Sequence, residues 1–280
     1  MKFRPAKKSF EIDDLPASRR EQYLDFFKTR AGLFFAFGGL FLFSCLPLLA
    51  AILFKYYVLL LPASKSLGEE EYLSFYKTTS LLFNAIYCLC YLFLFIVFAG
   101  AGRVSKQWAQ GKGIYFWHDF LLGIKKNIGP YLLLWLLFSI FYLLCKLVAL
   151  LASKLWVSYL VSGLCLLLLP WLMMAMVETL YYSNNAVKLL SSSFSYCLKK
   201  PLSTLAFLLL PYGLLCISLI DQVMIMVLVI VLSVFLLLPL YFLGWHLYAL
   251  SLFDEFTNKE FYPSIYQKGL RGEFKKEEER

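Results

Sequence analysis

The sequence predicts an all-α, polytopic membrane protein: a helical bundle with six transmembrane helices, arranged as three units. In each unit a surface-lying segment, here called an elbow, is followed by a pair of antiparallel helices. Hydrophobic residues make up 61% of the chain and charged residues only 16%, whereas a soluble domain carries about 25% charged residues. The other two observations that predict this fold class are the long apolar runs and a recurring basic, amphipathic segment. We therefore expect lipid to be the main solvent.

The apolar runs are long enough to cross a bilayer, which takes about 20 predominantly apolar residues in a helix. They are continuous and rich in Leu and Phe rather than alternating, so strands are not expected. The first run follows Arg30 and is too long for a cleaved signal peptide, so it should be retained. The predicted spans are residues 31–54, 81–101, 128–151, 155–182, 203–220 and 223–253.

The charge distribution predicts the orientation. The segments 1–30, 102–127, 183–202 and 254–280 hold 8, 5, 3 and 6 lysine and arginine residues, which is 22 of the 27 in the chain. By the positive-inside rule these segments are cytoplasmic. We expect one membrane domain, 31–253, in the plasma membrane, with cytoplasmic segments 1–30 and 254–280. Because the basic residues are divided among four segments, they favour anionic lipid over nucleic acid as the partner.

The segment before the third span has the pattern of a helix lying in the membrane surface. Its apolar residues recur at helical spacing and its charged residues fall mostly on the other side. The apolar stripe consists of Trp117, Phe120, Leu121, Ile124 and Ile128. Lys125 and Lys126 lie outside the stripe, and Pro130 permits a bend into the span because proline is tolerated in a first helical turn.

This elbow recurs along the chain. DFLLGIKKNI (119–128) aligns with SFSYCLKKPL (193–202), which supplies Phe194, Lys199 and Lys200 as the matching residues. A fainter copy, DFFKTRAGLF (25–34), precedes the first span, and chance is the alternative explanation for it. Internal repeats are common in membrane folds that surround a central site, but they also arise in purely structural bundles.

With the elbows in view, the chain resembles the YesL-like family of Gram-positive bacterial membrane proteins. The segments that carry the resemblance are GAGRVSKQWAQGKGIYFWHDFLLGIKKN (100–127), NNAVKLLSSSFSYCLKKPL (184–202) and FDEFTNKEFYPSIY (253–266). The family positions matched in the first segment are Gly100, Gly102, Arg103, Trp117, Asp119, Phe120, Lys126 and Asn127. The family's proline-rich stretch after the first span is reduced here to Pro47. The resemblance implies a role in carbohydrate uptake or its regulation beside ABC transporters, and it transfers no catalytic residue.

Signatures of enzymes are absent from the sequence. It contains no H-E-x-x-H, G-x-S-x-G or Walker-type motif, and the GKG at 111–113 lacks the spacing of a phosphate-binding loop. Two histidines and no Cys/His cluster make a metal or haem site improbable. Six of the seven cysteines lie in apolar runs and are expected to be small buried side chains. We expect no enzymatic activity, no cofactor and no metal.

Polar residues within apolar runs are the candidates for a functional site, because burying them in lipid is costly. The sequence offers Glu178, His246 and Asn84 within spans, and Arg103 at the inner mouth of the second span. A cluster of these residues at a cytoplasm-facing cavity would make a proton- or substrate-responsive site. The alternative is that each residue braces helices through hydrogen bonds.

Prolines interrupt four of the predicted spans, at Pro47, Pro170, Pro211 and Pro239. They are either hinges around a cavity or the ordinary prolines of membrane helices.

Two functions are therefore predicted. The first is a non-enzymatic accessory or regulatory protein of a carbohydrate ABC transport system, whose permease subunits would be its partners. The second is a small-solute or lipid transporter with a cytoplasm-facing polar site. A polar cavity that reaches the midplane would favour the second function, and a packed apolar interior the first.

Overall fold

The computed structural model describes residues 15–151, 155–207 and 223–272, and within these ranges it contains helices, π-helical turns and loops but no strand. The elements are α1 (Arg19–Thr29), α2 (Ala31–Leu53), η2 (Phe54–Leu60), α3 (Leu61–Ser66), α4 (Glu69–Ala109), α5 (Phe116–Leu151), α6 (Leu155–Tyr181), α7 (Ala186–Lys199), α9 (Val223–Leu232), η4 (Ser233–Leu237), α10 (Leu238–Phe253), η5 (Asp254–Asn258) and α11 (Lys259–Phe261). Residues 201–207 are also helical. The predicted all-α class is confirmed.

Four helices in the described part of the chain are long and apolar enough to cross a membrane: Ala31–Ser66, Glu69–Ala109, Phe116–Leu151 and Val227–Phe261. They contain the first, second, third and most of the sixth predicted spans. The fourth predicted span coincides with α6, in which Leu167–Tyr181 forms a shorter apolar stretch. Most of the fifth, including Pro211, lies outside the described residues. A membrane helical bundle is therefore supported, while the number six stays a prediction.

The long helices leave most of their apolar surface uncovered by protein. Only 17% to 33% of the most apolar stretch of each is buried, so a second apolar medium must cover the rest. Helices of 35 to 41 residues are about 52–62 Å long at 1.5 Å per residue. They exceed a hydrocarbon core of about 30 Å, so part of each helix extends beyond it.

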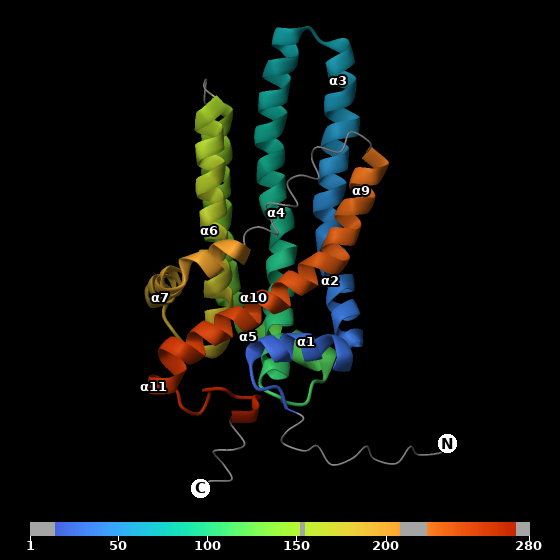
Figure 1. The fold of residues 1–280 in the computed structure, drawn as a ribbon. Coiled ribbons are helices and arrows are strands. Elements are labelled where there is room, and N and C mark those ends of the chain that lie inside the picture. Colours follow the sequence, from blue (N-terminus) through green and yellow to red (C-terminus); the bar gives the residue numbers. More distant parts are fainter. Residues whose placement is uncertain (1–14, 152–154, 208–222, 273–280) are drawn as a thin grey trace, which may run out of the picture.

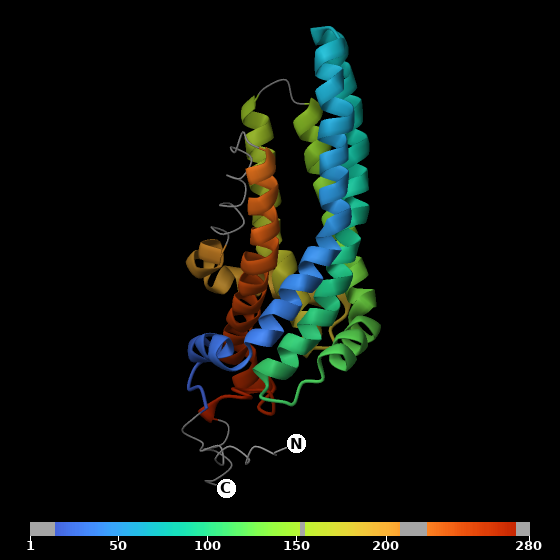
Figure 2. The same ribbon diagram turned by 90° about the vertical axis from the view of Figure 1, so that its right-hand side faces the viewer.

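The helices gather at one end of the molecule. In Figures 1 and 2, α2 and α4 stand side by side, while α1 lies across the lower end and α10 runs obliquely over α4 and α6. We call this lower end, formed by α1, the loop at 110–115 and α11, the basal end. Helix α1 is capped there: the Ser18 side chain accepts from the Glu21 amide at 3.2 Å, and the Glu21 side chain accepts at 2.8 Å from the amide of Ala17, the residue before the cap.

A proline and a glycine together determine where α2 meets the last long helix. Pro239 has no N–H to donate, so the carbonyl of Phe235, four residues earlier, is freed from the α-helical pattern within the π-helical turn η4. A Cβ atom on Gly38 of α2 would lie 2.4 Å from this carbonyl oxygen. Only glycine permits so close an approach between the two backbones. Pro47, Pro130 and Pro170, by contrast, lie inside continuous helices.

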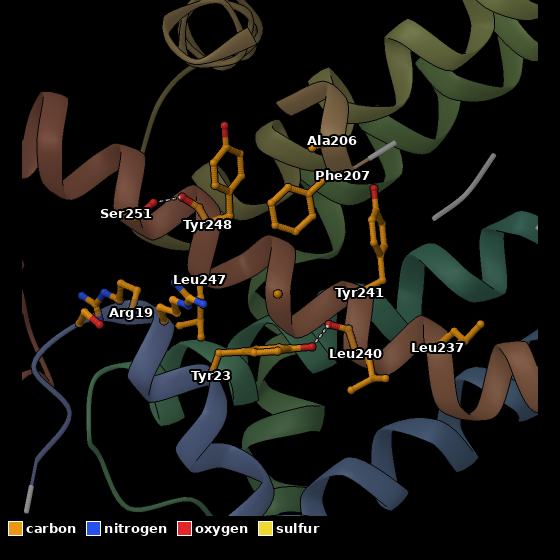
Figure 3. Close-up of a pocket in the computed structure, with 13 residues that line it drawn as sticks. Arg19, Tyr23, Ala206, Phe207, Leu237, Leu240, Tyr241, Leu247, Tyr248 and Ser251 are labelled. Carbon is orange, nitrogen blue, oxygen red and sulfur yellow. Dashed lines mark hydrogen bonds between the residues drawn. The ribbon is translucent and has the colours of Figure 1, made fainter. Parts of the chain in front are cut away.

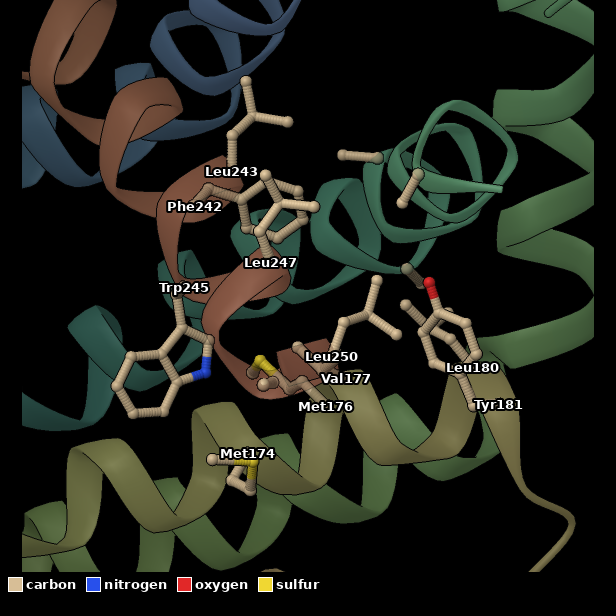
Figure 4. Close-up of a cluster of buried hydrophobic side chains, with 14 of the residues drawn as sticks. Met174, Met176, Val177, Leu180, Tyr181, Phe242, Leu243, Trp245, Leu247 and Leu250 are labelled. Carbon is tan, nitrogen blue, oxygen red and sulfur yellow. The ribbon is translucent and has the colours of Figure 1, made fainter. Parts of the chain in front are cut away.

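The buried core lies where α10 crosses α6 and α4. Most of α10 is buried, and Figure 4 shows its side chains meeting those of α6. The rings of Phe98 and Phe242 stack at 5.3 Å between centroids, which joins α4 to the same core. Side chains in this core that are less than 2% exposed include Trp245, Tyr131, Met174, Leu243, Leu252 and His246.

The three predicted elbows have different local structures. Helix α1 is separated from α2 at Arg30, and α7 ends at Lys199, before the helical residues 201–207. In contrast, α5 continues as one helix from Phe116 through Pro130 to Leu151, so the structure shows no separate surface helix there. Three equivalent elbow units therefore stay a prediction.

Candidate functional site

The most extensive polar network of the described residues lies at the basal end around Arg19, in the first turn of α1. Its guanidinium donates to Asp254 from Nε at 3.2 Å and from Nη2 at 2.9 Å. Its Nη1 donates to the side chain of Gln22 and to the carbonyls of Ala109 and Lys268, each at 3.0 Å. The contacts of this one side chain thus connect α1, the end of α4, η5 and the segment after α11.

The second oxygen of Asp254 extends this network toward α6. It accepts from the Asn258 amide group at 2.8 Å and from the backbone N–H of Gln267 at 3.3 Å. Asn258 is fully buried and accepts from the Tyr182 hydroxyl at 2.5 Å. Because Arg19 and Asp254 are both less than 10% exposed and mutually satisfied, their charges hold segments together and are not free to bind a ligand.

Glu178 occupies a buried position near the end of α6 and is 1% exposed. One carboxylate oxygen accepts from the side chains of Asn184 at 2.8 Å and Ser192 at 2.5 Å. The other oxygen has no hydrogen-bond partner in the described part of the chain. Glu178 therefore ties the end of α6 to the start of α7, and it retains one acceptor that a ligand, a water molecule or a proton could satisfy.

His246 lies inside the core on α10 and is fully buried. Its Nε2 is 2.9 Å from the hydroxyl of Tyr181, and its Nδ1 has no partner among the described residues. The hydrogen bond links α10 to α6, which is the bracing role that the sequence left as an alternative. The described residues contain no group of three or more His, Cys, Asp or Glu side chains able to hold a metal ion.

Arg103 and Asn84 have other partners on α5. Nε of Arg103 lies 3.8 Å from a carboxylate oxygen of Asp119, whose second oxygen accepts from the Tyr115 amide at 2.9 Å. The hydroxyl of Tyr142 donates to Asn84 at 3.3 Å. The hydrogen bonds and ion pairs of the described residues connect none of the four candidates Glu178, His246, Arg103 and Asn84 to another, so each is placed in a contact of its own.

The predicted elbow residues fall into exposed and buried groups. Trp117 is 64% exposed and Lys125 and Lys126 are exposed, whereas Phe120 is buried. The ring of Phe120 lies so close to α4 that a Cβ atom on Gly100 would come within 2.5 Å of it. Part of the stripe expected to face the membrane thus packs on the protein instead.

Of the matching residues of the second elbow, Phe194 and Lys199 lie on α7 and Lys200 follows its end. Phe194 is 51% exposed, although its ring also contacts Trp171 of α6. Lys199 is exposed and lies 4.4 Å from the ring centroid of Phe256, and Lys200 forms an ion pair with Glu255 at 2.5 Å. These contacts attach α7 to η5 and leave its outer apolar residues uncovered.

In the third copy the apolar residues face the protein. Phe26 is fully buried, with its ring 4.8 Å from that of Trp108, and the hydroxyl of Tyr23 donates to the carbonyl of Leu240 at 3.3 Å. The side chain of Phe27 lies outside those described. Helix α1 is consequently packed on α4 and α10.

A pocket of about 770 Å³ opens between α1, α10 and residues 201–207, as Figure 3 shows. Its walls are mainly apolar and aromatic, and polar groups lie toward the start of α1. The lining residues include Arg20, Tyr23, Phe207, Leu240, Tyr241 and Gly244. Burial raises the pKa of Tyr23, so its hydroxyl stays protonated and donates to Leu240.

Neither this pocket nor the Arg19–Asp254 pair is predicted from the sequence. Arg19 lies in a terminal basic segment, and Asp254 was noted only within the FDEFTN stretch of the family resemblance. The one local signal was the Ser18-x-x-Glu21 capping pattern. It predicts a helix that begins at Arg19 and therefore brings Arg19 and Arg20 to its first turn.

Comparison with known proteins adds no assignment to this geometry. No family model, no curated protein and no solved structure matches the chain.

Proposed function

We propose that the chain is a non-enzymatic membrane protein that acts as an accessory or regulatory partner of a membrane transport system. The resemblance stated above makes a carbohydrate ABC transporter the expected system. The observation that best supports this function is the packed interior where α6 and α10 cross. Met174, Leu243 and Leu252 are fully buried there, so the described residues at this crossing form a close-packed apolar interior without a polar path for a solute.

Exposed residues of α5 and α7 supply contacts for such a partner. Trp117 of α5 and Phe194 of α7 expose large aromatic rings, and Lys125 and Lys199 on the same two helices are exposed. Exposed aromatic side chains with nearby cations are typical of interaction surfaces and of the membrane interface. With the predicted orientation, this surface faces the cytoplasm, where the coupling regions of ABC transporters also lie.

Co-purification tests the proposal. A tagged chain extracted in mild detergent should retain the permease subunits of the transporter. The double variant Trp117→Ala and Phe194→Ala should lose them, because it removes two large rings that are 64% and 51% exposed. Leu82→Ala, at a 61% exposed position on α4, 27 residues before the end of that helix at Ala109, is the matched control and should retain them. Absence of permease subunits from a stable wild-type preparation would refute this function.

Lipid handling is the second candidate function, and the pocket at Tyr241 and Gly244 is the observation that favours it. In this case the chain alone, in liposomes, should move a labelled lipid between leaflets or to acceptor vesicles. Solute flux in the same liposomes would instead support a small-solute transporter. Glu178→Gln should reduce that flux if the free carboxylate oxygen takes part in it.

A further inference from the structure

The pocket between α1, α10 and residues 201–207 combines features that no other part of the described molecule shares. It is large and mainly apolar, it is partly open, and a cation lies at its rim. Its volume of about 770 Å³ is within the range of small-molecule sites, about 300–1,000 Å³. Figure 3 shows Tyr23, Phe207 and Tyr241 on different sides of the pocket, each from a different helical segment.

Gly244 keeps the floor of the pocket open. A Cβ atom there would lie 3.6 Å from the ring of Tyr23 and 3.7 Å from that of Phe207. These distances are ordinary van der Waals contacts, so alanine would fit, but a longer side chain would extend into the pocket. The floor therefore has room for apolar atoms in contact with both aromatic rings, which suits a flexible hydrocarbon chain.

The rim of the pocket attracts negative charge. Arg20 is exposed and has no ion-pair partner among the described residues, whereas its neighbour Arg19 is committed to Asp254. Both lie in the first turn of α1, where the positive end of the helix dipole adds to the attraction. A ligand with an anionic group at Arg20 and an apolar chain over Gly244 is amphipathic.

The position in the fold identifies the source of this ligand. Helix α1 lies across the ends of the long apolar helices, and basic pockets between membrane helices on the cytoplasmic side bind anionic lipid headgroups. We propose that this pocket binds one anionic phospholipid, with its phosphate at Arg20 and an acyl chain over Gly244, between the rings of Tyr23 and Phe207. The site deepens the second candidate function, lipid handling, and rests on the same pocket, but retention of one lipid can be measured whether or not the chain moves lipid between membranes.

Native mass spectrometry of the delipidated full chain in mild detergent tests this site. Titration with phosphatidylglycerol should give one retained lipid per chain, and phosphatidylcholine of the same acyl composition should bind more weakly. Arg20→Gln should lower the affinity for phosphatidylglycerol about fivefold, from one basic residue near an anionic surface. The affinity for phosphatidylcholine should stay unchanged. Equal binding of the two lipids by the wild type, or no effect of Arg20→Gln, would overturn the assignment of the headgroup.

Two further variants separate the acyl site from non-specific lipid. Gly244→Leu should abolish retention of both lipids, and Gly39→Leu, at an exposed position on α2 with no atom within 4 Å of a new Cβ, should change nothing. Inorganic phosphate should not displace the lipid. Displacement by phosphate, or equal retention by Gly244→Leu and wild type, would contradict the proposal.

Discussion

The buried pair of Arg19 and Asp254 joins residues 235 positions apart. Both charges have left water, and both are compensated by several hydrogen bonds. Such a pair contributes little net stability relative to a well-packed apolar pair, but removing one partner leaves an uncompensated buried charge. Its role is to specify how α1 and η5 meet at the end of α4.

Asp254→Asn should therefore lower the free energy of unfolding by about 3–5 kcal/mol, the usual cost of breaking a buried pair. The measurement is thermal unfolding in mild detergent together with proteolysis of the segment before α1. Lys200→Gln is the matched control, because it breaks an ion pair whose side chains are 41% and 49% exposed. A solvent-exposed pair contributes about 0–1 kcal/mol. Similar melting temperatures for the two variants would contradict the structural role of the buried pair.

The pH dependence of the reactivity of Cys197, on α7, tests whether its side chain is buried. Burial raises the pKa of its thiol from the usual 9.0 to about 12. Since the thiolate is the reactive form, a chain retaining only this cysteine should react slowly with an alkylating reagent at pH 8. Its rate should rise about tenfold for each pH unit up to pH 11. A rate that levels off near pH 9 would show that α7 is not packed on the protein.

The crossing of α4 and α5 depends on small side chains. A Cβ atom on Gly123 would lie 2.8 Å from Cβ of Arg103 and 3.0 Å from the Ala99 carbonyl and the Gly100 Cα. Small residues at such crossings let membrane helices approach closely. The Arg103–Asp119 pair flanks the same crossing, so the spacing of the helices also determines that contact.

Gly123→Ala should destabilise the protein by about 1–3 kcal/mol, because the backbone of α4 cannot yield to the added methyl group. Gly129→Ala, on the same helix with nothing within 4 Å of the new Cβ, should be neutral or stabilising by up to about 1 kcal/mol from helix propensity. Comparison of the two melting curves in one detergent measures the difference. If Gly123→Ala unfolded no earlier than Gly129→Ala, α4 and α5 would not be in close contact here.

Across the molecule, the distribution of basic residues predicts that the basal end is cytoplasmic. A thiol introduced at Gly113, in the loop between α4 and α5, should be protected from a membrane-impermeant reagent in intact cells. A thiol introduced at Ser66, at the end of α3, should react. Both positions are exposed. Each thiol is introduced into a variant from which the seven natural cysteines have been removed. The reverse labelling pattern would invert the topology and remove the cytoplasmic docking surface from the proposed function.

The candidate polar residues show what the local sequence can predict and what it cannot. Glu178 and His246 were identified as costly buried groups from their apolar neighbours alone, and both are buried. Their hydrogen-bond partners were not foreseen, because Ser192 and Tyr181 meet them only through the packing of α7 and α10 on α6. The pocket was missed for the same reason, since its three walls come from segments remote in the sequence.

By itself, the sequence determined that the chain is helical and apolar over long stretches, because periodicity and composition act over a few turns. Only the tertiary structure decided which groups share a site. It paired Arg19 with Asp254 and left Arg20 and Tyr241 beside an open pocket. The physical reason is that the partner of a buried polar group is chosen by packing between distant helices. No local pattern of residues encodes that choice.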